Sequence, residues 1–450
     1  MPLGHFFEGK QQLGIAFCIV LGAFWTTKER CVLPPPHTAM EGIGYFHIHA
    51  VKQQSSFFSK SLVYEGELKS FFSKEKGQYY YKIPCRVFVA GKKRPKADCD
   101  YLIKGRLSSK NFSCYSLKPC KKTPWQRIPN SISFAEMRWQ IKTNVKKVLR
   151  SKISDPEIFS FFSLLATGES PNLLLPHYFR QVGLSHLLVI SGFHFALLSL
   201  CWGFALRLFL PKQIAYFLLL LLLVLYELYL GPSPSSERAS LAIYIFLFGI
   251  LIGRKASPLN TLGMALLVQL AYRPLLLFHI GFQLSYAATF AIFLFYPYVE
   301  KKLFFLLPKR EFQVLKKGSI LDRHLFLACS WIRKQIALLI AVHLFTLPLI
   351  LYYFFDFPLL SFVYNLYAAP LVSLCFIFLL FAFFPLLSFF ILPMLLPLAR
   401  FTLNIIIYAP KALDFHFRTQ KISSCFLTAL MTALLLFGLM VYEKNEEKIL

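Results

Sequence analysis

Long apolar blocks dominate the second half of the chain. Residues 184–210, 213–230 and 424–440 read LSHLLVISGFHFALLSLCWGFALRLFL, QIAYFLLLLLLVLYELYL and SCFLTALMTALLLFGLM. A hydrocarbon core of about 30 Å needs about 20 helical residues, which these blocks provide. Because backbone groups in lipid must be satisfied within the segment, each block is predicted to be a transmembrane helix.

Nine such blocks follow residue 184, and one shorter block precedes them. The predicted spans are 186–210, 213–230, 238–253, 258–272, 275–297, 335–355, 358–383, 386–408 and 424–441. For 258–297, broken or re-entrant helices are the alternative. The block LGIAFCIVLGAFW at 13–25 has no small-x-small cleavage site after it, so we interpret it as an uncleaved first span rather than a signal peptide. We expect a polytopic α-helical membrane protein with about ten spans.

Residues 27–150 follow a different pattern. Runs such as GYFHIHAV (44–51), SLVYEGEL (61–68) and QYYYKIPCRVFVA (78–90) alternate aromatic or β-branched residues with polar ones. This period of two predicts a small β-sandwich or barrel. The stretch 133–153 instead predicts a basic amphipathic helix at the membrane surface. The expected organisation is a first span (1–26), a β-rich domain (27–130), an amphipathic connecting region (131–183), a membrane domain (184–441) and a short cytoplasmic tail (442–450).

The charge distribution sharpens this picture. Of the chain's formal net charge of +27, residues 27–150 hold most, with 25 Lys and Arg against 8 Asp and Glu. The loop 301–334 carries nine Lys and Arg against Glu311 and Asp322, so the positive-inside rule makes it cytoplasmic. Counting back five spans places 27–150 outside the cytoplasm, and both termini inside. Composition agrees with a membrane protein: 56% of residues are hydrophobic and the mean hydropathy is +0.54.

The basic, aromatic-rich β-domain suggests a polyanion as its partner. Lysine and arginine neutralise phosphates, and tyrosine rings stack on bases. The candidate DNA-binding residues are Lys92, Lys93, Arg94, Lys96, Lys104 and Arg106, with Tyr79, Tyr80, Tyr81 and Tyr101. Contact with anionic lipid, or mere solubility, explains the same composition equally well.

The segment HLLVISGFH (186–194) places polar groups inside an apolar block. On one continuous helix, His186, Ser191 and His194 would share one face, as expected for groups that meet an aqueous path or a partner helix. An intramembrane serine hydrolase using Ser191 is the alternative, with His343 as a nameable base. No nucleotide-binding or metal-ligand motif occurs, since Val51 and Lys52 follow His47-Ile-His49 where a metallo-hydrolase needs Asp and His. We therefore expect no cofactor and no metal.

Three ordered segments resemble the ComEC family of DNA-uptake channel proteins. They are HLLVISGFHFALLSL (186–200), the stretch 235–297 with GRKASPLN and GFQLSYAA, and the stretch 340–374 with FTLPLILYYF and NLYAAPLV. The positions that match the family's polar motif residues are His186, Ser191, Gly192, His194, Arg238, Gln283 and Asn365. The resemblance implies an extracytoplasmic OB-like domain where this chain has its basic β-domain.

The function that this resemblance implies is import of single-stranded DNA into the cytoplasm during natural transformation, by a multi-pass channel in the bacterial inner (plasma) membrane. The expected partners are single-stranded DNA, membrane lipid, and a separate DNA receptor, nuclease and cytoplasmic motor, with homo-oligomerisation as a further expectation. The form expected here lacks the C-terminal metallo-β-lactamase-like domain of many members. A permease for another solute is the remaining alternative, and we expect a non-enzyme.

Overall fold

The computed structural model describes most of the chain beyond residue 38. The described residues are 39–55, 60–89, 94–111, 114–120, 123–172, 174–188, 192–231, 233–253, 257–305, 319–408, 415–420 and 422–446. The predicted first span at 13–25 and the candidate residues Lys92, Lys93 and Ser191 lie outside these ranges. The chain divides into two compact units: the first holds 1–178, 186–279 and 375–400, and the second holds 179–185, 280–374 and 401–450.

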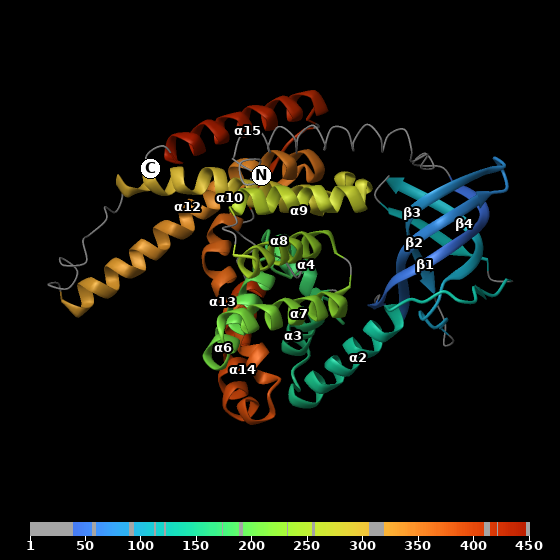
Figure 1. Ribbon diagram of the computed structural model, residues 1–450, viewed down its shortest axis with the longest axis horizontal. Coiled ribbons are helices and arrows are strands. Elements are labelled where there is room, and N and C mark those ends of the chain that lie inside the picture. Colours follow the sequence, from blue (N-terminus) through green and yellow to red (C-terminus); the bar gives the residue numbers. More distant parts are fainter. Residues whose placement is uncertain are drawn as a thin grey trace. The chain divides into compact units, whose positions relative to one another are not determined.

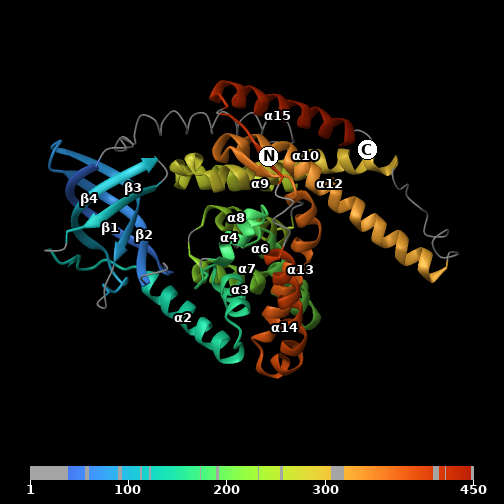
Figure 2. The ribbon, with the colours of Figure 1, turned by 180° about the vertical axis from the view of Figure 1, so that it is seen from behind.

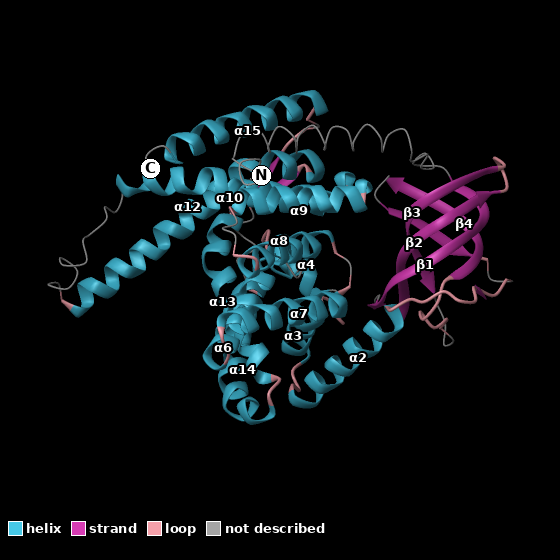
Figure 3. Cartoon of the chain, viewed as in Figure 1, coloured by secondary structure: helices cyan, strands magenta, loops and turns pink. Residues whose placement is uncertain are grey.

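The β-rich domain forms a small closed barrel (Figure 1), and strands are otherwise confined to one short ribbon among the described residues (Figure 3). Neighbouring strands follow the order β1-β2-β3-β5-β4-β6, and β1 also pairs with β4, which closes the sheet. All pairs are antiparallel except β3 with β5. This closed Greek-key arrangement of five main strands is OB-like. The strands are β1 (Ala39–Ser55), β2 (Lys60–Ser73), β3 (Gln78–Val89), β4 (Tyr101–Asn111), β5 (Cys114–Pro119) and β6 (Gln126–Arg127).

Closure depends on the long first strand. It pairs with β2 over residues 42–55 and with β4 over residues 39–46. Register shifts after Tyr45 and Ile48 allow it to curve, as β-bulges do. At Gly66 of β2, an added Cβ would lie 2.0 Å from the His47 carbonyl oxygen, so the close approach of these two strands requires glycine.

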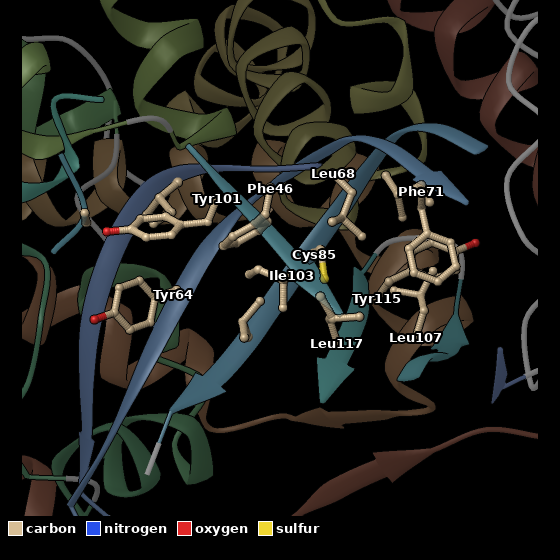
Figure 4. Packing of buried hydrophobic residues seen from close by; sticks show 14 of the residues in the cluster. Phe46, Tyr64, Leu68, Phe71, Cys85, Tyr101, Ile103, Leu107, Tyr115 and Leu117 are labelled. Atoms are coloured by element: carbon tan, nitrogen blue, oxygen red, sulfur yellow. The ribbon is translucent and has the colours of Figure 1, made fainter. Parts of the chain in front are cut away.

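The alternating pattern fills the barrel with apolar side chains (Figure 4). On β3, Tyr80, Ile83, Cys85 and Val87 are buried, while the side chains between them are exposed or partly exposed. Their burial is the main stabilising contribution to this fold. Figure 4 labels ten members of the core: Phe46, Tyr64, Leu68, Phe71, Cys85, Tyr101, Ile103, Leu107, Tyr115 and Leu117.

Two helices follow the barrel. A helix is present where 133–153 predicts one, as α2 (Ala135–Lys152), and α3 (Pro156–Thr167) comes directly after it. Its place at the membrane surface stays a prediction. Asp155 caps α3 by accepting hydrogen bonds from the amides of Glu157 and Ile158, and Gly168 ends it in the left-handed conformation.

The remaining chain is almost entirely helical. Seven helices in the described part are long and apolar enough to cross a membrane: α6, α7, α10, α12, α13, α14 and α15. This confirms a multi-pass helical membrane protein. The helices after α3 are α4 (Leu174–Gln181), α5 (Ser185–Leu188), α6 (Gly192–Phe209), α7 (Lys212–Leu230), α8 (Pro234–Leu251), α9 (Pro258–Tyr272), η2 (Pro274–Phe278), α10 (Ile280–Lys302), η3 (Leu303–Phe305), α12 (Ile320–Phe354), α13 (Ser361–Ala382), α14 (Pro385–Ile407) and α15 (Ser424–Glu446).

Three predicted segments differ from the structure. Helices α8 and α9, which correspond to the predicted spans 238–253 and 258–272, are not among the seven candidates. Helix α9 has only 15 residues, and the short 3₁₀ helix η2 separates it from α10. The predicted loop 301–334 is also partly helical, because α12 begins at Ile320 and runs for 35 residues.

Each unit has its own helical core. In the first, α6, α7 and α8 pack through Phe195, Leu198, Leu223 and Leu247. In the second, α10, α12 and α15 lie side by side in both views (Figures 1 and 2), with Phe295 stacked on Phe437. The second unit also holds a two-stranded ribbon of β7 (Asp356–Pro358) and β8 (His416–Arg418).

Candidate functional site

The motif segment lies at a junction between two helices. Helix α5 ends at Leu188 and α6 begins at Gly192. His186 on α5 is exposed, whereas His194 in the first turn of α6 is only 3% exposed. The His194 ring meets the Phe376 ring edge to face, with 4.9 Å between their centroids. A buried imidazole on an otherwise apolar helix marks this turn as a candidate site.

Gly192 makes room for an arginine. A Cβ atom added at residue 192 would lie 2.7 Å from an Nη atom of Arg238 and 3.2 Å from the Cβ of Ala239, both on α8. Arg238 is itself 9% exposed. The structure thus places Gly192 against Arg238, two residues of the predicted motif set, whereas His194, two positions further along α6, meets Phe376 instead.

More polar groups line the neighbouring helices. The Tyr244 hydroxyl of α8 donates to the Glu227 carboxylate of α7 at 2.6 Å. Arg273, which follows α9, donates to the Glu237 carboxylate of α8 at 2.9 Å. The helices α6 to α9 therefore enclose several charged side chains, each of which would be costly to leave facing lipid.

The other two motif residues belong to the second unit. Gln283 on α10 accepts a hydrogen bond from the Tyr353 hydroxyl of α12 at 2.7 Å. Asn365 is 7% exposed and donates to the Ser361 carbonyl of its own helix at 2.7 Å. Both side chains hold helices or backbone together, which is the common role of amides in membrane helices.

His343 lies among aromatic rings. Its Nδ1 lies 2.8 Å from the Leu339 carbonyl oxygen, to which it donates. Its ring packs against the rings of Phe357 and Phe362, at 5.5 and 4.3 Å between centroids. This hydrogen bond fixes the tautomer with its basic lone pair on Nε2, the arrangement that a general base also uses. Ser191 lies outside the described residues, so a pairing of His343 with Ser191 stays a hypothesis.

The barrel carries an aromatic face on β2 and β3. Tyr79 and Tyr81 are each 59% exposed, and their rings are nearly parallel with centroids 6.3 Å apart. Phe72 on β2 lies beside Tyr79, with ring centroids 4.9 Å apart. The β2–β3 face is the surface on which OB-folds bind oligonucleotides, and stacked aromatic rings are what bases pack on.

Three of the predicted DNA-binding residues are instead structural. Tyr80 and Tyr101 are only 2% and 3% exposed, because strand alternation turns them into the core, so neither can stack on a base. Arg94 is bound by both Glu136 carboxylate oxygens, at 2.9 and 2.5 Å, and its guanidinium lies 3.9 Å from the centre of the Trp139 ring. Its donors serve α2 rather than a phosphate.

Exposed basic residues lie on β3, β4 and β5 and on the segment between β3 and β4. Lys96, Lys104 and Arg106 are all exposed, as predicted for phosphate contacts. The sequence reasoning missed Arg86 on β3 and Lys118 on β5, which are also exposed. Arg106 pairs in register with Lys118, and Arg86 with Ser116, so basic side chains continue across β4, β5 and β3. The alternation along β3 and β5 was the signal that could have identified them.

Within the described residues, no group of three or more His, Cys, Asp or Glu side chains is placed to hold a metal ion. The nearest arrangement is His47, whose Nδ1 lies 2.5 Å from the buried Asp100 carboxylate. Lys69 binds the second carboxylate oxygen at 2.8 Å. Burial acts to raise the pKa of Asp100, but hydrogen bonds from Lys69 and His47 outweigh it and keep the pKa below its usual range. This cluster is a satisfied structural network.

Fold and site together define a multi-pass helical membrane protein with an OB-like barrel and a buried polar motif at the start of α6. Residues 175–445 match the family model described as "Competence protein", so the chain belongs to that family. It is 30% identical over 198 residues to ComE operon protein 3 of Bacillus subtilis (strain 168). The alignment covers 44% of this chain and 22% of that protein, so the chain matches about a fifth of the relative's length. No solved structure matches the chain.

Proposed function

We propose that this chain passes single-stranded DNA through the bacterial inner membrane into the cytoplasm during natural transformation. One observation carries the proposal: an OB-like barrel with exposed stacked tyrosines is joined to a helical membrane domain of the competence family. The barrel would collect the strand and the helices would form its path. Membership of the family supports DNA as the cargo, and no cofactor is required for either role.

The barrel combines the two features that sequence-tolerant strand binding needs. Tyr79 and Tyr81 offer stacking surfaces, and Lys104, Arg106 and Lys118 offer charges for the phosphates. The first turn of α2 belongs to the same folding unit, because Ala135 is a member of the barrel core. A fragment covering 35–153 is therefore the right one for testing strand binding.

The path through the helices would pass the junction of α5 and α6. Gly192 leaves room beside Arg238, and His194, two residues further along α6, is buried against Phe376. Arginine and histidine can both donate hydrogen bonds to phosphate oxygens, arginine with a permanent charge. We expect Ser191 to line the same path without forming a covalent intermediate.

The proposed sidedness places the barrel outside the cytoplasm and residues 301–334 inside. Between them lie α6, α7 and α10, with α8 and α9 in addition. If both short helices cross, or if neither does, the number of crossings stays odd and the sidedness is unchanged. Reporter fusions at Gly91 and Lys309 should therefore report opposite sides, and the same side for both would overturn the topology.

The remaining partners belong to the same proposal. A DNA receptor, a nuclease and a cytoplasmic motor would act with this chain as separate proteins. Association of several copies in the membrane is part of the proposal. The C-terminus would lie in the cytoplasm, because α15 is the last crossing in the same count.

A hydrolase at Ser191 and a permease for another solute are the competing functions. A deletion strain offered labelled DNA and labelled small solutes separates the permease from our proposal, since only DNA uptake should be lost. A serine-reactive probe separates the hydrolase. Labelling of the wild type but not of Ser191→Ala, together with loss of uptake in that variant, would favour the enzyme.

A further inference from the structure

Arg94 forms the joint between the barrel and α2. It follows β3 and reaches Glu136 in the first turn of α2, where its Nη1 and Nη2 atoms bind Oε2 and Oε1 at 2.9 and 2.5 Å. The Glu136 carboxylate also accepts from the Ala97 amide at 2.9 Å. A planar guanidinium that meets a carboxylate with two hydrogen bonds fixes orientation as well as distance.

The joint is enclosed rather than exposed. The side chain of Glu136 is 10% exposed and that of Arg94 is 22% exposed, and the Trp139 ring covers the guanidinium at 3.9 Å. Burial acts to raise the pKa of Glu136, but the hydrogen bonds from Arg94 and from the Ala97 amide outweigh it, so the pKa is lowered. Glu136 therefore stays charged and the ion pair stays formed at neutral pH.

A second contact supports the same joint. The Ser133 hydroxyl, just before α2, donates to the Ile48 carbonyl of β1 at 2.6 Å. Ala135 is part of the barrel core. The start of α2 is thus attached to the barrel by the ion pair, by the Ser133 hydroxyl and by the packing of Ala135.

The middle of α2 is attached to the helical part of the same unit. Lys142 donates to Glu169 at 3.2 Å and to the Leu230 carbonyl, at the end of α7, at 2.8 Å. Lys146 donates to the other Glu169 oxygen at 2.6 Å. The Arg138 guanidinium lies against Gly231, where an added Cβ would be 2.8 Å away. Helix α2 therefore joins the barrel at its start and α7 further along.

We propose that Arg94 is a positioning residue for DNA uptake, because its joint with Glu136 holds the barrel on α2 at the angle that delivers a bound strand to the helices. The proposal rests on the proposed function. It assigns Arg94 a role in delivery and none in strand binding. The Nη atoms of Arg94 already donate to Glu136, and the Trp139 ring covers its guanidinium plane, so a phosphate has little access to it. Neighbouring Lys96 is exposed and makes no such joint.

The test compares variants of the full-length chain in membranes, at matched protein levels. Arg94→Ala and Glu136→Gln each break the joint, and Arg94→Glu with Glu136→Arg restores the pair with exchanged charges. Lys147→Ala, at an exposed residue of α2, is the control. Two quantities are measured: the Kd and salt dependence of single-stranded DNA binding to the membranes, and the rate of DNA import at saturating DNA.

Each single change should lower the import rate at least about tenfold, since misplacing a distant positioning group can cost up to about a hundredfold. The Kd and its salt dependence should stay at the wild-type value. Lys147→Ala should leave the import rate unchanged, and the exchanged pair should recover part of the lost rate. A fold that merely collapsed would lose binding as well.

Two results would overturn the inference. If Arg94→Ala weakens binding and flattens the salt dependence, Arg94 is a phosphate ligand. If import persists at the wild-type rate, the joint has no role in delivery. A wild type that binds single-stranded DNA without importing it would instead overturn the proposed function, and so the two failures are distinguishable.

Discussion

The barrel and the membrane helices use the same polar residue types in opposite ways. In the barrel, the candidate binding groups such as Tyr79 and Arg106 are exposed, and buried ones such as Tyr101 are structural. In the helices, His194 and Arg238 are buried, and burial is what singles them out. Water surrounds the barrel, so a ligand meets its surface. Lipid surrounds the helices, so a polar cargo can meet only their interior.

The largest effect is expected at Gly192, where an added side chain meets Arg238 and Ala239. Gly192→Leu should abolish DNA uptake, because its side chain must displace Arg238 and Ala239. Gly192→Ala should reduce uptake less, since the far end of Arg238 can move aside. Gly263→Ala on α9 is the control, because an added Cβ there meets nothing within 4 Å. Equal loss of uptake in the control would mean that any added bulk in these helices is harmful, and the comparison would fail.

A smaller loss is expected from changes to the polar groups themselves. His194→Leu should reduce uptake at matched protein levels. It removes the buried imidazole, which can donate a hydrogen bond, and replaces it with an apolar side chain of similar size. Ser191→Ala should cost little, since one neutral hydrogen bond contributes only about 0.5–1.5 kcal/mol. Abolition of uptake by Ser191→Ala alone would contradict the path and favour the hydrolase.

On the barrel, removal of the stacking rings should weaken single-stranded DNA binding more than removal of any one basic side chain. Tyr79→Ala and Tyr81→Ala in the 35–153 fragment should each weaken single-stranded DNA binding by about 1–3 kcal/mol per lost base contact. Tyr79→Phe and Tyr81→Phe keep the ring and should bind like the wild type. Titration of a fluorescent oligonucleotide measures all four. Equal losses for Ala and Phe would point to the hydroxyl groups rather than to stacking.

The smallest expected effect concerns salt. Lys104→Ala and Arg106→Ala should each lower the slope of log K against log salt by about 0.7, the value for one phosphate contact on a single strand. Arg94→Ala should leave that slope unchanged. Lys92 and Lys93 remain predicted contacts, and the double change to Ala should flatten the slope further. If the slope of log K against log salt is the same in Lys104→Ala and Arg106→Ala as in the wild type, the phosphates bind elsewhere.

The parts predicted from the sequence were those governed by short-range patterns. Block length and apolar content predicted α6, α7, α10 and α12 to α15 as spans, because the bilayer imposes both. Strand alternation predicted the barrel. The same alternation could have shown that Tyr80 points into the core and does not bind DNA. It is not strict, however, because the backbone at Lys82 takes a positive φ of 54°. A period of two therefore does not continue through Tyr79–Ile83.

The parts that could not be predicted depend on residues far apart in the chain. Arg94 meets Glu136 across 42 residues, and Gly192 meets Arg238 across a similar interval. Nothing local distinguishes Arg94 from exposed Lys96. The sequence allowed either two full spans or broken helices over 258–297. The apolar run after Pro274 is compatible with both, and the structure forms the short 3₁₀ helix η2 there.

The central claim is that DNA crosses the membrane through the helices of this protein. The most direct measurement is the amount of labelled single-stranded DNA in the cytoplasm, protected from external nuclease, in a strain without the gene that carries either the wild type or Gly192→Leu. The account predicts protected DNA with the wild type and none with the variant, while both strains bind equal DNA at the surface. Protected DNA in the variant strain, or in the strain with neither protein, would contradict it.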